Sequence, residues 1–244
     1  MTELIVDVAP DAAQTAQRAA ALICDMLCAD DAVGAVCLAG GGTPRELYRL
    51  LAREPFRSRI PWARVHWFFG DERFVPPDDP RSNARMVREA LFSQAPIPEA
   101  HVHQVPTVGL TLEDSADRYQ KTLQDFYGTA RLRRDRPLFD VVILGLGPDG
   151  HTASLLPGRR EIDVTDRWVC AVGAGMPEPR ITLTPPALES AHAITFVVTG
   201  AEKRAAFAKL RSGDQSIPAT HVRPRTRLLA FVDAAAGTNA PTPG

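Results

Sequence analysis

The sequence predicts an α/β protein in which one doubly wound, mostly parallel sheet forms a single domain. Short apolar runs alternate with amphipathic segments along the 244 residues, a pattern typical of parallel sheets covered by helices. The hydrophobic content of 45% is sufficient for one substantial core. We expect residues 1–233 to form this domain and the small-residue, proline-containing stretch 234–244 to be a disordered tail.

The expected strands are short apolar runs, and the expected helices carry apolar residues at helical spacing. The strands cover residues 4–8, 35–39, 64–69, 140–144, 168–172, 193–199 and 228–232. The helices cover residues 11–28, 44–51, 82–92, 111–126 and 201–210. The long, proline-rich loops at 75–81 and 173–179 suit the formation of a site better than tight structural turns.

The charge balance argues against polyanionic partners. Lysine and arginine number 28 and aspartate and glutamate 29, so the formal net charge is -1 and offers no field for nucleic acid or an acidic membrane. Any anion-binding site must therefore be local. No signal-peptide pattern is visible and no apolar run reaches about 18 residues. We expect a cytoplasmic protein with neither a nucleic-acid nor a membrane partner.

Cysteines and histidines show no spacing typical of metal ligands, so no metal site is expected. The cysteines, at positions 24, 28, 37 and 170, are predicted to be small buried hydrophobes in a reducing compartment. The histidines at positions 66, 101, 103, 192 and 221 are expected to be structural or exposed.

The segment 140–158, DVVILGLGPDGHTASLLPG, places a histidine directly after an apolar strand and a glycine-rich turn. Glycines at 145, 147 and 150 allow the backbone to bend sharply and approach a ligand. His151 follows at the carboxyl end of the strand, where open α/β sheets bind ligands, and an imidazole there can act as a general base. Residues 152–154 are expected to start a short helix. An incidental histidine in a turn between core elements is the structural alternative.

The same turn satisfies the G-x-G-x-x-G pattern of dinucleotide-binding proteins, but two features oppose that interpretation. Pro148 removes a backbone N–H where a pyrophosphate cradle needs one. The segment after the turn contains Pro157 and Gly158 and does not resemble a long crossover helix, although Asp163 and Asp166 lie at a tolerable distance for a ribose contact. A dinucleotide is therefore the less favoured ligand.

A second glycine-rich turn, GGGTP at residues 40–44, has the composition of an anion-binding turn at the start of a helix. Gly41 and Gly42 let backbone N–H groups point inward, Thr43 can cap the helix or donate its hydroxyl, and the helix N-terminus favours a phosphate. The lysine and the spacing of a Walker loop are missing, so a nucleoside triphosphate is not expected. A turn needed only for close strand-to-helix passage is the structural alternative.

Charged residues follow further strands. Asp71 and Arg73 come directly after the run 64–69, where the guanidinium suits bidentate phosphate binding and the carboxylate suits sugar hydroxyls or the orientation of a catalytic group. Arg180 and Lys203 lie near later strand ends, and a lysine at a helix start suits an incoming anion better than it suits the helix dipole. Solvated surface charge is the alternative for each of them.

Five motifs, in this order, resemble the 6-phosphogluconolactonase family of the oxidative pentose phosphate pathway. They are GGGTP, GDERFVPPDDPRSN, LGLGPDGHTASLLPG, RITLTPPAL and VTGAEKR, and the resemblance extends from about Leu38 to Pro224. It implies an α/β sheet with helices on both faces, related to glucosamine-6-phosphate deaminase. It also implies hydrolysis of 6-phospho-D-glucono-1,5-lactone to 6-phospho-D-gluconate by an ester hydrolase that needs no metal or organic cofactor.

By this resemblance, His151 is the base that activates water, and Asp71 is the partner of substrate hydroxyls or of the histidine. The implied contacts of the phosphate or the sugar are Gly41, Gly42, Thr43, Arg73, Arg180 and Lys203. Leu156 stands where many relatives carry Phe, a difference expected to change packing beside the site only. The expected partner is a small-molecule sugar-phosphate lactone, and a monomer is favoured.

Two alternatives remain beside the lactonase hypothesis. A sugar-phosphate deaminase or isomerase of the same superfamily needs a glutamate five residues after the histidine to open the sugar ring, and Leu156 occupies that position. A sugar-phosphate sensor without activity is the other alternative, but no output module is visible and His151 is retained.

Overall fold

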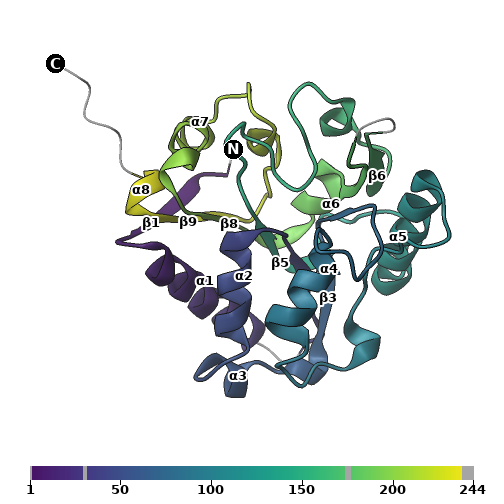
Figure 1. Cartoon of the computed structure of the whole chain (residues 1–244), viewed down its shortest axis with the longest axis horizontal. Helices are drawn as coiled ribbons and strands as arrows, with labels where there is room; N and C mark the ends of the chain where they lie inside the picture. The colour runs from purple at the N-terminus through teal and green to yellow at the C-terminus, as the bar shows by residue number, and fades with distance from the viewer. Residues whose placement is uncertain (1, 30–31, 174–176, 238–244) are drawn as a thin grey trace.

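The computed structural model describes residues 2–29, 32–173 and 177–237, and its centre is a six-stranded sheet (Figure 1). The strand order is β1-β9-β8-β5-β2-β3, and every neighbouring pair is parallel. The bounds are Leu4–Ala9 (β1), Gly34–Leu38 (β2), Val65–Phe69 (β3), Phe139–Leu144 (β5), Ala191–Val198 (β8) and Arg227–Asp233 (β9). The prediction of an α/β fold with a mostly parallel sheet is confirmed.

A second, antiparallel sheet of three short strands was not predicted. Its order is β4-β7-β6, with bounds Asp71–Arg73 (β4), Arg180–Leu183 (β7) and Val169–Val172 (β6). Gly70 joins the two sheets, because its N–H donates to the carbonyl of Leu38 and its own carbonyl accepts from the N–H of Leu183. The sequence predicted a strand only at 168–172, and β4 pairs with β7 across more than 100 residues, a contact that leaves no local pattern.

Helices lie on both faces of the main sheet. Figure 1 shows α1 and α2 on one side of β1, β9 and β8, and α7 on the other. The bounds are Ala12–Leu27 (α1), Gly42–Leu51 (α2), Phe56–Arg59 (α3), Asn83–Val87 (α4), Leu112–Tyr127 (α5), Pro185–Glu189 (α6), Arg204–Ser212 (α7) and Ala234–Gly237 (α8). The helix expected over 82–92 is α4 followed by the wider π-helical turn Arg88–Phe92. None of the described helices is long and apolar enough to cross a membrane.

The sheet topology brings two of the predicted glycine turns together. From β2 the chain continues to the edge strand β3 and then returns to β5 on the other side of β2. The strand order therefore reverses between β2 and β5, and ligands of open α/β sheets bind at the carboxyl ends of the strands at such a point. The GGGTP turn follows β2 and the histidine turn follows β5.

The predicted core is present, with one exception among the cysteines. Cys24, Cys37 and Cys170 are buried free thiols, whereas Cys28 is exposed because it lies at the end of α1. The exposed thiol donates a hydrogen bond to the carbonyl of Arg59 at 3.3 Å.

The first four residues of the expected tail, 234–237, are helical rather than disordered. The carboxylate of Asp233 accepts a hydrogen bond from the N–H of Ala236 at 2.8 Å, and the guanidinium of Arg204 donates to the carbonyl of Ala235. These contacts hold α8 against α7. Residues 238–244 lie outside the described residues.

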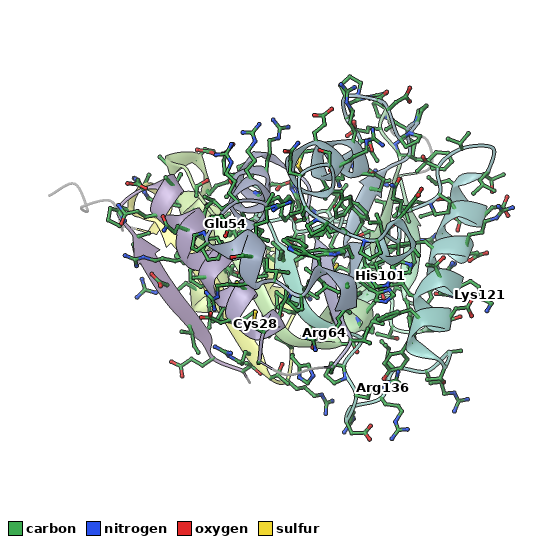
Figure 2. The ribbon with its side chains drawn as sticks, turned by 90° about the horizontal axis from the view of Figure 1, so that it is seen from below. Cys28, Glu54, Arg64, His101, Lys121 and Arg136 are labelled. Atoms are coloured by element: carbon green, nitrogen blue, oxygen red, sulfur yellow. The ribbon has the colours of Figure 1, made fainter. Side chains whose placement is uncertain are left out.

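Three histidines, His66, His101 and His103, stack at the amino end of β3. Figure 2 shows His101 beside α5. The rings of His66 and His101 lie 4.0 Å apart, and Nδ1 of His66 lies 2.8 Å from Nε2 of His103. The ring of His103 also stacks on Phe68 at 4.3 Å. Burial, together with the neighbouring histidines, lowers the pKa of His66 and lowers the pKa of His103 to about 4. His66 and His103 are therefore neutral at pH 7.

This cluster makes stability depend on pH. The unfolded chain binds a proton at His103 near pH 6.5, whereas the folded chain resists protonation until about pH 4. The free energy of unfolding therefore falls as the pH falls between these values, by about 1–2 kcal/mol once partial exposure is allowed for. Urea denaturation at pH 7 and pH 5 should show this loss, and His103→Phe should reduce it. The exposed His192→Gln is the control, and an unaltered loss in His103→Phe would contradict the prediction.

Candidate functional site

One cavity of about 980 Å³ opens at the carboxyl ends of the parallel strands. Its lining includes every residue that the sequence singled out for a site: Gly41, Gly42, Thr43, Asp71, Arg73, His151, Arg180 and Lys203. These residues come from the ends of three parallel strands and from the antiparallel sheet. The structure thus brings together five segments that are far apart in the sequence.

The GGGTP turn forms one wall of the cavity and leads into α2. Gly41 is the N-cap residue and has φ 100°, a backbone conformation that favours glycine. Thr43 does not cap the helix; its hydroxyl instead lies 2.8 Å from that of Thr199, which follows β8. The first N–H groups of α2 have no partner within the helix, so the turn can present them to an anion.

Another part of the lining carries His151, whose ring is held by a neighbouring carboxylate. Nδ1 of His151 lies 2.6 Å from Oδ1 of Asp149, and the same oxygen accepts a hydrogen bond from the His151 N–H at 3.2 Å. Burial raises the pKa of the Asp149 carboxyl, but these two hydrogen bonds outweigh it and the pKa lies below its ordinary value. An ionised carboxylate only accepts hydrogen bonds, so Nδ1 of His151 carries the proton. In this tautomer, Nε2 is the ring nitrogen that offers its lone pair to the cavity.

The histidine turn is folded on itself and is not a pyrophosphate cradle. The N–H of Gly147 donates to the carbonyl of His151 at 2.8 Å, and the N–H of Gly150 donates to the carbonyl of Gly147. Pro148 has no N–H. These groups are therefore unavailable to a ligand, which argues against the dinucleotide interpretation.

No helix follows His151, contrary to the expectation for residues 152–154. Ala153 has φ 48°, and the chain forms a tight turn in which the N–H of Leu155 donates to the carbonyl of Thr152. The hydroxyl of Thr152 donates back to the carbonyl of Gly145 at 2.8 Å. This turn places Ser154 against the antiparallel sheet, where its N–H donates to the hydroxyl of Thr182.

Asp71 is a buried carboxylate at the base of the cavity. One oxygen accepts a hydrogen bond from the hydroxyl of Ser154 at 2.6 Å, and the other accepts from the side-chain amide of Asn83 at 3.2 Å. The carboxylate that contacts His151 is that of Asp149, whereas the partners of the Asp71 carboxylate are Ser154 and Asn83. The contact with substrate hydroxyls stays a prediction.

Glu72, next to Asp71, faces away from the cavity and fixes the local backbone. Its carboxylate accepts hydrogen bonds from the N–H groups of Arg73, Asn83 and Ala84 and from the hydroxyl of Ser82. Burial raises the pKa of this carboxyl, although the three backbone N–H groups oppose the shift. The anchored Asn83 then packs against the GGGTP turn, because a Cβ at Gly40 would lie 2.0 Å from its side-chain oxygen.

Three cations line the cavity. Arg73 and Arg180 occupy directly opposite positions on β4 and β7, and the Nε of each is buried without a hydrogen-bond partner among the described residues. Lys203 lies beyond the end of β8, after Gly200, whose φ of 101° allows the sharp turn there. Two basic side chains are thus fixed on one sheet and a third approaches from the other.

Sequence reasoning missed several residues that shape the site. Asp149 was visible in the GPDGH motif, two residues before the histidine, and a carboxylate so close to a proposed base was a usable signal. Asn83 and Ser154 act through contacts across 12 and 83 residues, which no local pattern reveals.

Within the described ranges, no group of three or more His, Cys, Asp or Glu residues is arranged to hold a metal ion.

Comparison with known proteins gives consistent matches over most of the chain. A family model described as glucosamine-6-phosphate isomerases/6-phosphogluconolactonase matches residues 9–231. The 6-phosphogluconolactonase of Nostoc sp. is 40% identical over 205 residues, which are 83% of this chain and 82% of that protein. That of Synechocystis sp. is 39% identical over 209 residues, or 84% of each chain.

Solved structures agree with these matches. The crystal structure of 6-phosphogluconolactonase from Thermotoga maritima has a TM-score of 0.81 and 32% identity, and covers 95% of this chain and 100% of that one. A monomeric glucosamine-6-phosphate deaminase, at 21% identity and a TM-score of 0.80, shares the fold. The chain therefore belongs to the glucosamine-6-phosphate isomerase/6-phosphogluconolactonase family.

Proposed function

We propose that this protein hydrolyses 6-phospho-D-glucono-1,5-lactone to 6-phospho-D-gluconate, with His151 as the general base. The observation that carries the proposal is the single cavity that collects an oriented histidine, a glycine turn at a helix start and three cations. Relatives that are about 40% identical over most of the chain bear the name 6-phosphogluconolactonase, which supports the same reaction.

The proposed reaction begins with water held by Nε2 of His151. As the water oxygen bonds to C1 of the lactone, Nε2 takes one water proton, and Asp149 stabilises the imidazolium through Nδ1–H. The C1 carbonyl oxygen becomes an oxyanion in the tetrahedral intermediate. When the intermediate collapses, the bond between C1 and the ring oxygen breaks, and the imidazolium returns its proton to that oxygen. The base is thereby regenerated.

Substrate binding is assigned to the cations and the glycine turn. A phosphate dianion suits planar guanidinium groups and the free N–H groups of a helix N-terminus. We therefore propose that Arg73, Arg180 and Lys203, with the backbone of Gly41 to Thr43, bind the phosphate or the sugar. Asp71 is proposed to accept hydrogen bonds from sugar hydroxyls.

The deaminase alternative lacks an acid for ring opening. Leu156 occupies the position where a glutamate would be needed, and it does not line the cavity. The sensor alternative predicts substrate binding without turnover. Hydrolysis of freshly prepared lactone, corrected for spontaneous opening, separates the lactonase from both alternatives.

Replacing the base should remove turnover and leave binding. We expect His151→Ala to lower kcat by about 10²–10⁴-fold, the range typical of general-base catalysis, with product affinity within a factor of about two. Stopped-flow or pH-stat assays of lactone opening measure the first quantity, and calorimetry with 6-phosphogluconate measures the second. Unchanged kcat would remove His151 from this role.

In contrast, Arg73→Ala and Lys203→Ala should mainly raise KM.

The Asp149 carboxylate should matter through the histidine it holds. We expect Asp149→Asn to lower kcat by at least about tenfold, because an amide can present its N–H to Nδ1 and so favour the wrong tautomer of His151. KM should change little. The exposed Asp135→Asn is the matched control, and equal kcat values in the two variants would argue against an orienting role.

A further inference from the structure

The two arginines of the cavity form a like-charge pair across β4 and β7. Arg73 and Arg180 are direct partners in the antiparallel register, and both line the cavity. Like charges in opposite positions of a sheet repel each other and tend to splay the side chains apart. Some feature of the structure must therefore hold the two guanidinium groups in place before an anion arrives.

Each of these guanidinium groups is held by a partner outside the cavity lining. Nη2 of Arg180 donates to Oε2 of Glu178 at 2.8 Å, and Nη1 of Arg73 donates to the backbone carbonyl of Arg81 at 2.6 Å. Neither Glu178 nor Arg81 lines the cavity, whereas both arginines they hold do. Glu178 is therefore placed as a support for Arg180 rather than as an occupant of the binding space.

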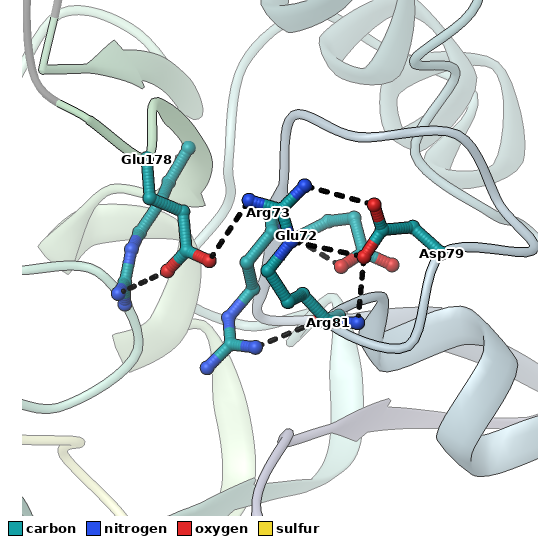
Figure 3. Close-up of polar contacts among 6 residues, drawn as sticks. Glu72, Arg73, Asp79, Arg81 and Glu178 are labelled. Atoms are coloured by element: carbon teal, nitrogen blue, oxygen red, sulfur yellow. Dashed lines mark hydrogen bonds and ion pairs between the residues drawn. The ribbon is translucent and has the colours of Figure 1, made fainter.

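The two supports are connected to each other, as Figure 3 shows. The second carboxylate oxygen of Glu178 lies 4.0 Å from Nη1 of Arg81. The Arg81 guanidinium in turn donates to both carboxylate oxygens of Asp79, at 2.9 and 2.8 Å. A chain of charges thus runs from Asp79 through Arg81 and Glu178 to Arg180, and it joins the loop after β4 to the segment before β7.

This chain of charges, taken together with Arg73, carries a net positive charge beside the cavity. Three guanidinium groups, of Arg73, Arg81 and Arg180, face two carboxylates, of Asp79 and Glu178, so one positive charge remains in excess. The side chains of Arg180 and Glu178 are only 19% and 26% exposed, so solvent screens their contact less than it screens a surface pair. Carboxylate support keeps a guanidinium in one orientation and lowers the entropy lost when an anion binds.

We propose, on the basis of the proposed function, that Glu178 is a positioning residue. It fixes the Arg180 guanidinium, and through Arg81 it steadies the carbonyl that holds Arg73. The substrate group that benefits is the phosphate, because a dianion can engage both arginines. Glu178 therefore sets how strongly the enzyme prefers a phosphorylated lactone to one without phosphate.

The test compares two lactone substrates and one ligand, 6-phosphogluconate, in wild type and Glu178→Gln. We expect the variant to raise KM for 6-phosphogluconolactone roughly fivefold, the effect of losing one partly exposed charged contact, with kcat unchanged. Activity on glucono-1,5-lactone, which has no phosphate, should stay the same. Calorimetry should show the same fivefold loss for 6-phosphogluconate. A general structural defect would lower activity on both lactones.

Three further variants make the test specific. Glu178→Asp retains the charge and should recover part of the affinity. Asp135→Asn removes a carboxylate from an exposed aspartate–arginine pair of the same two-residue spacing and should change nothing. In an Arg180→Ala background, Glu178→Gln should have a much smaller effect, because only the indirect support of Arg73 through Arg81 remains.

The outcomes separate this proposal from the proposed function. Hydrolysis by wild type with unchanged or lower KM in Glu178→Gln would overturn the positioning role alone; a lower KM would mean that the carboxylate competes with the phosphate. A wild type that neither opens the lactone nor binds 6-phosphogluconate would overturn the proposed function, and the positioning role with it.

Discussion

The geometry of the site depends on the buried carboxylate of Glu72. A buried charge is tolerated only where hydrogen bonds replace its water, and Glu72 accepts hydrogen bonds from four donors on β4 and at the start of α4. These bonds fix Asn83, which donates to Asp71 and leaves Gly40 no room for a side chain. The antiparallel sheet, the acidic base of the cavity and the glycine turn are thereby locked together by one side chain that does not line the cavity.

The parallel sheet and the residues that line the site could be predicted from the sequence, because both leave patterns in short stretches of the chain. Short runs such as 140–144 are apolar throughout, since a central parallel strand is covered on both faces. Glycine turns directly after such strands indicate ligand sites, because the carboxyl ends of parallel strands share one edge. Each turn was singled out from its own residues, the family resemblance assigned both to one site, and the structure places His151 and Gly41 in the lining of one cavity.

The remaining features depend on contacts between distant segments. The three residues 71–73 read as a charged loop, and only pairing with residues 180–182 makes them a strand. The sequence after His151 predicted a short helix. In the structure Ala153 instead has positive φ, and the hydroxyl of Ser154 donates a hydrogen bond to Asp71. Residues 234–237 resembled a disordered tail, but Asp233 caps them and Arg204 binds the carbonyl of Ala235. In each case tertiary contacts override a weak local preference.

Four carboxylates, of Glu46, Asp71, Glu202 and Asp233, line the cavity beside three cations, and yet it suits an anion. The difference lies in which charges already have partners. Asp71 accepts from Ser154 and Asn83, and Asp149 is bound to His151. Asp233 accepts from the N–H of Gly200 at the turn that leads to Lys203. By contrast, each cavity arginine commits one terminal nitrogen to a neighbouring oxygen, Nη1 of Arg73 to the carbonyl of Arg81 and Nη2 of Arg180 to Glu178, out of the five N–H donors that a guanidinium carries. A near-neutral protein can therefore attract a phosphate, because its carboxylates are satisfied internally while its guanidinium groups still have donors to offer.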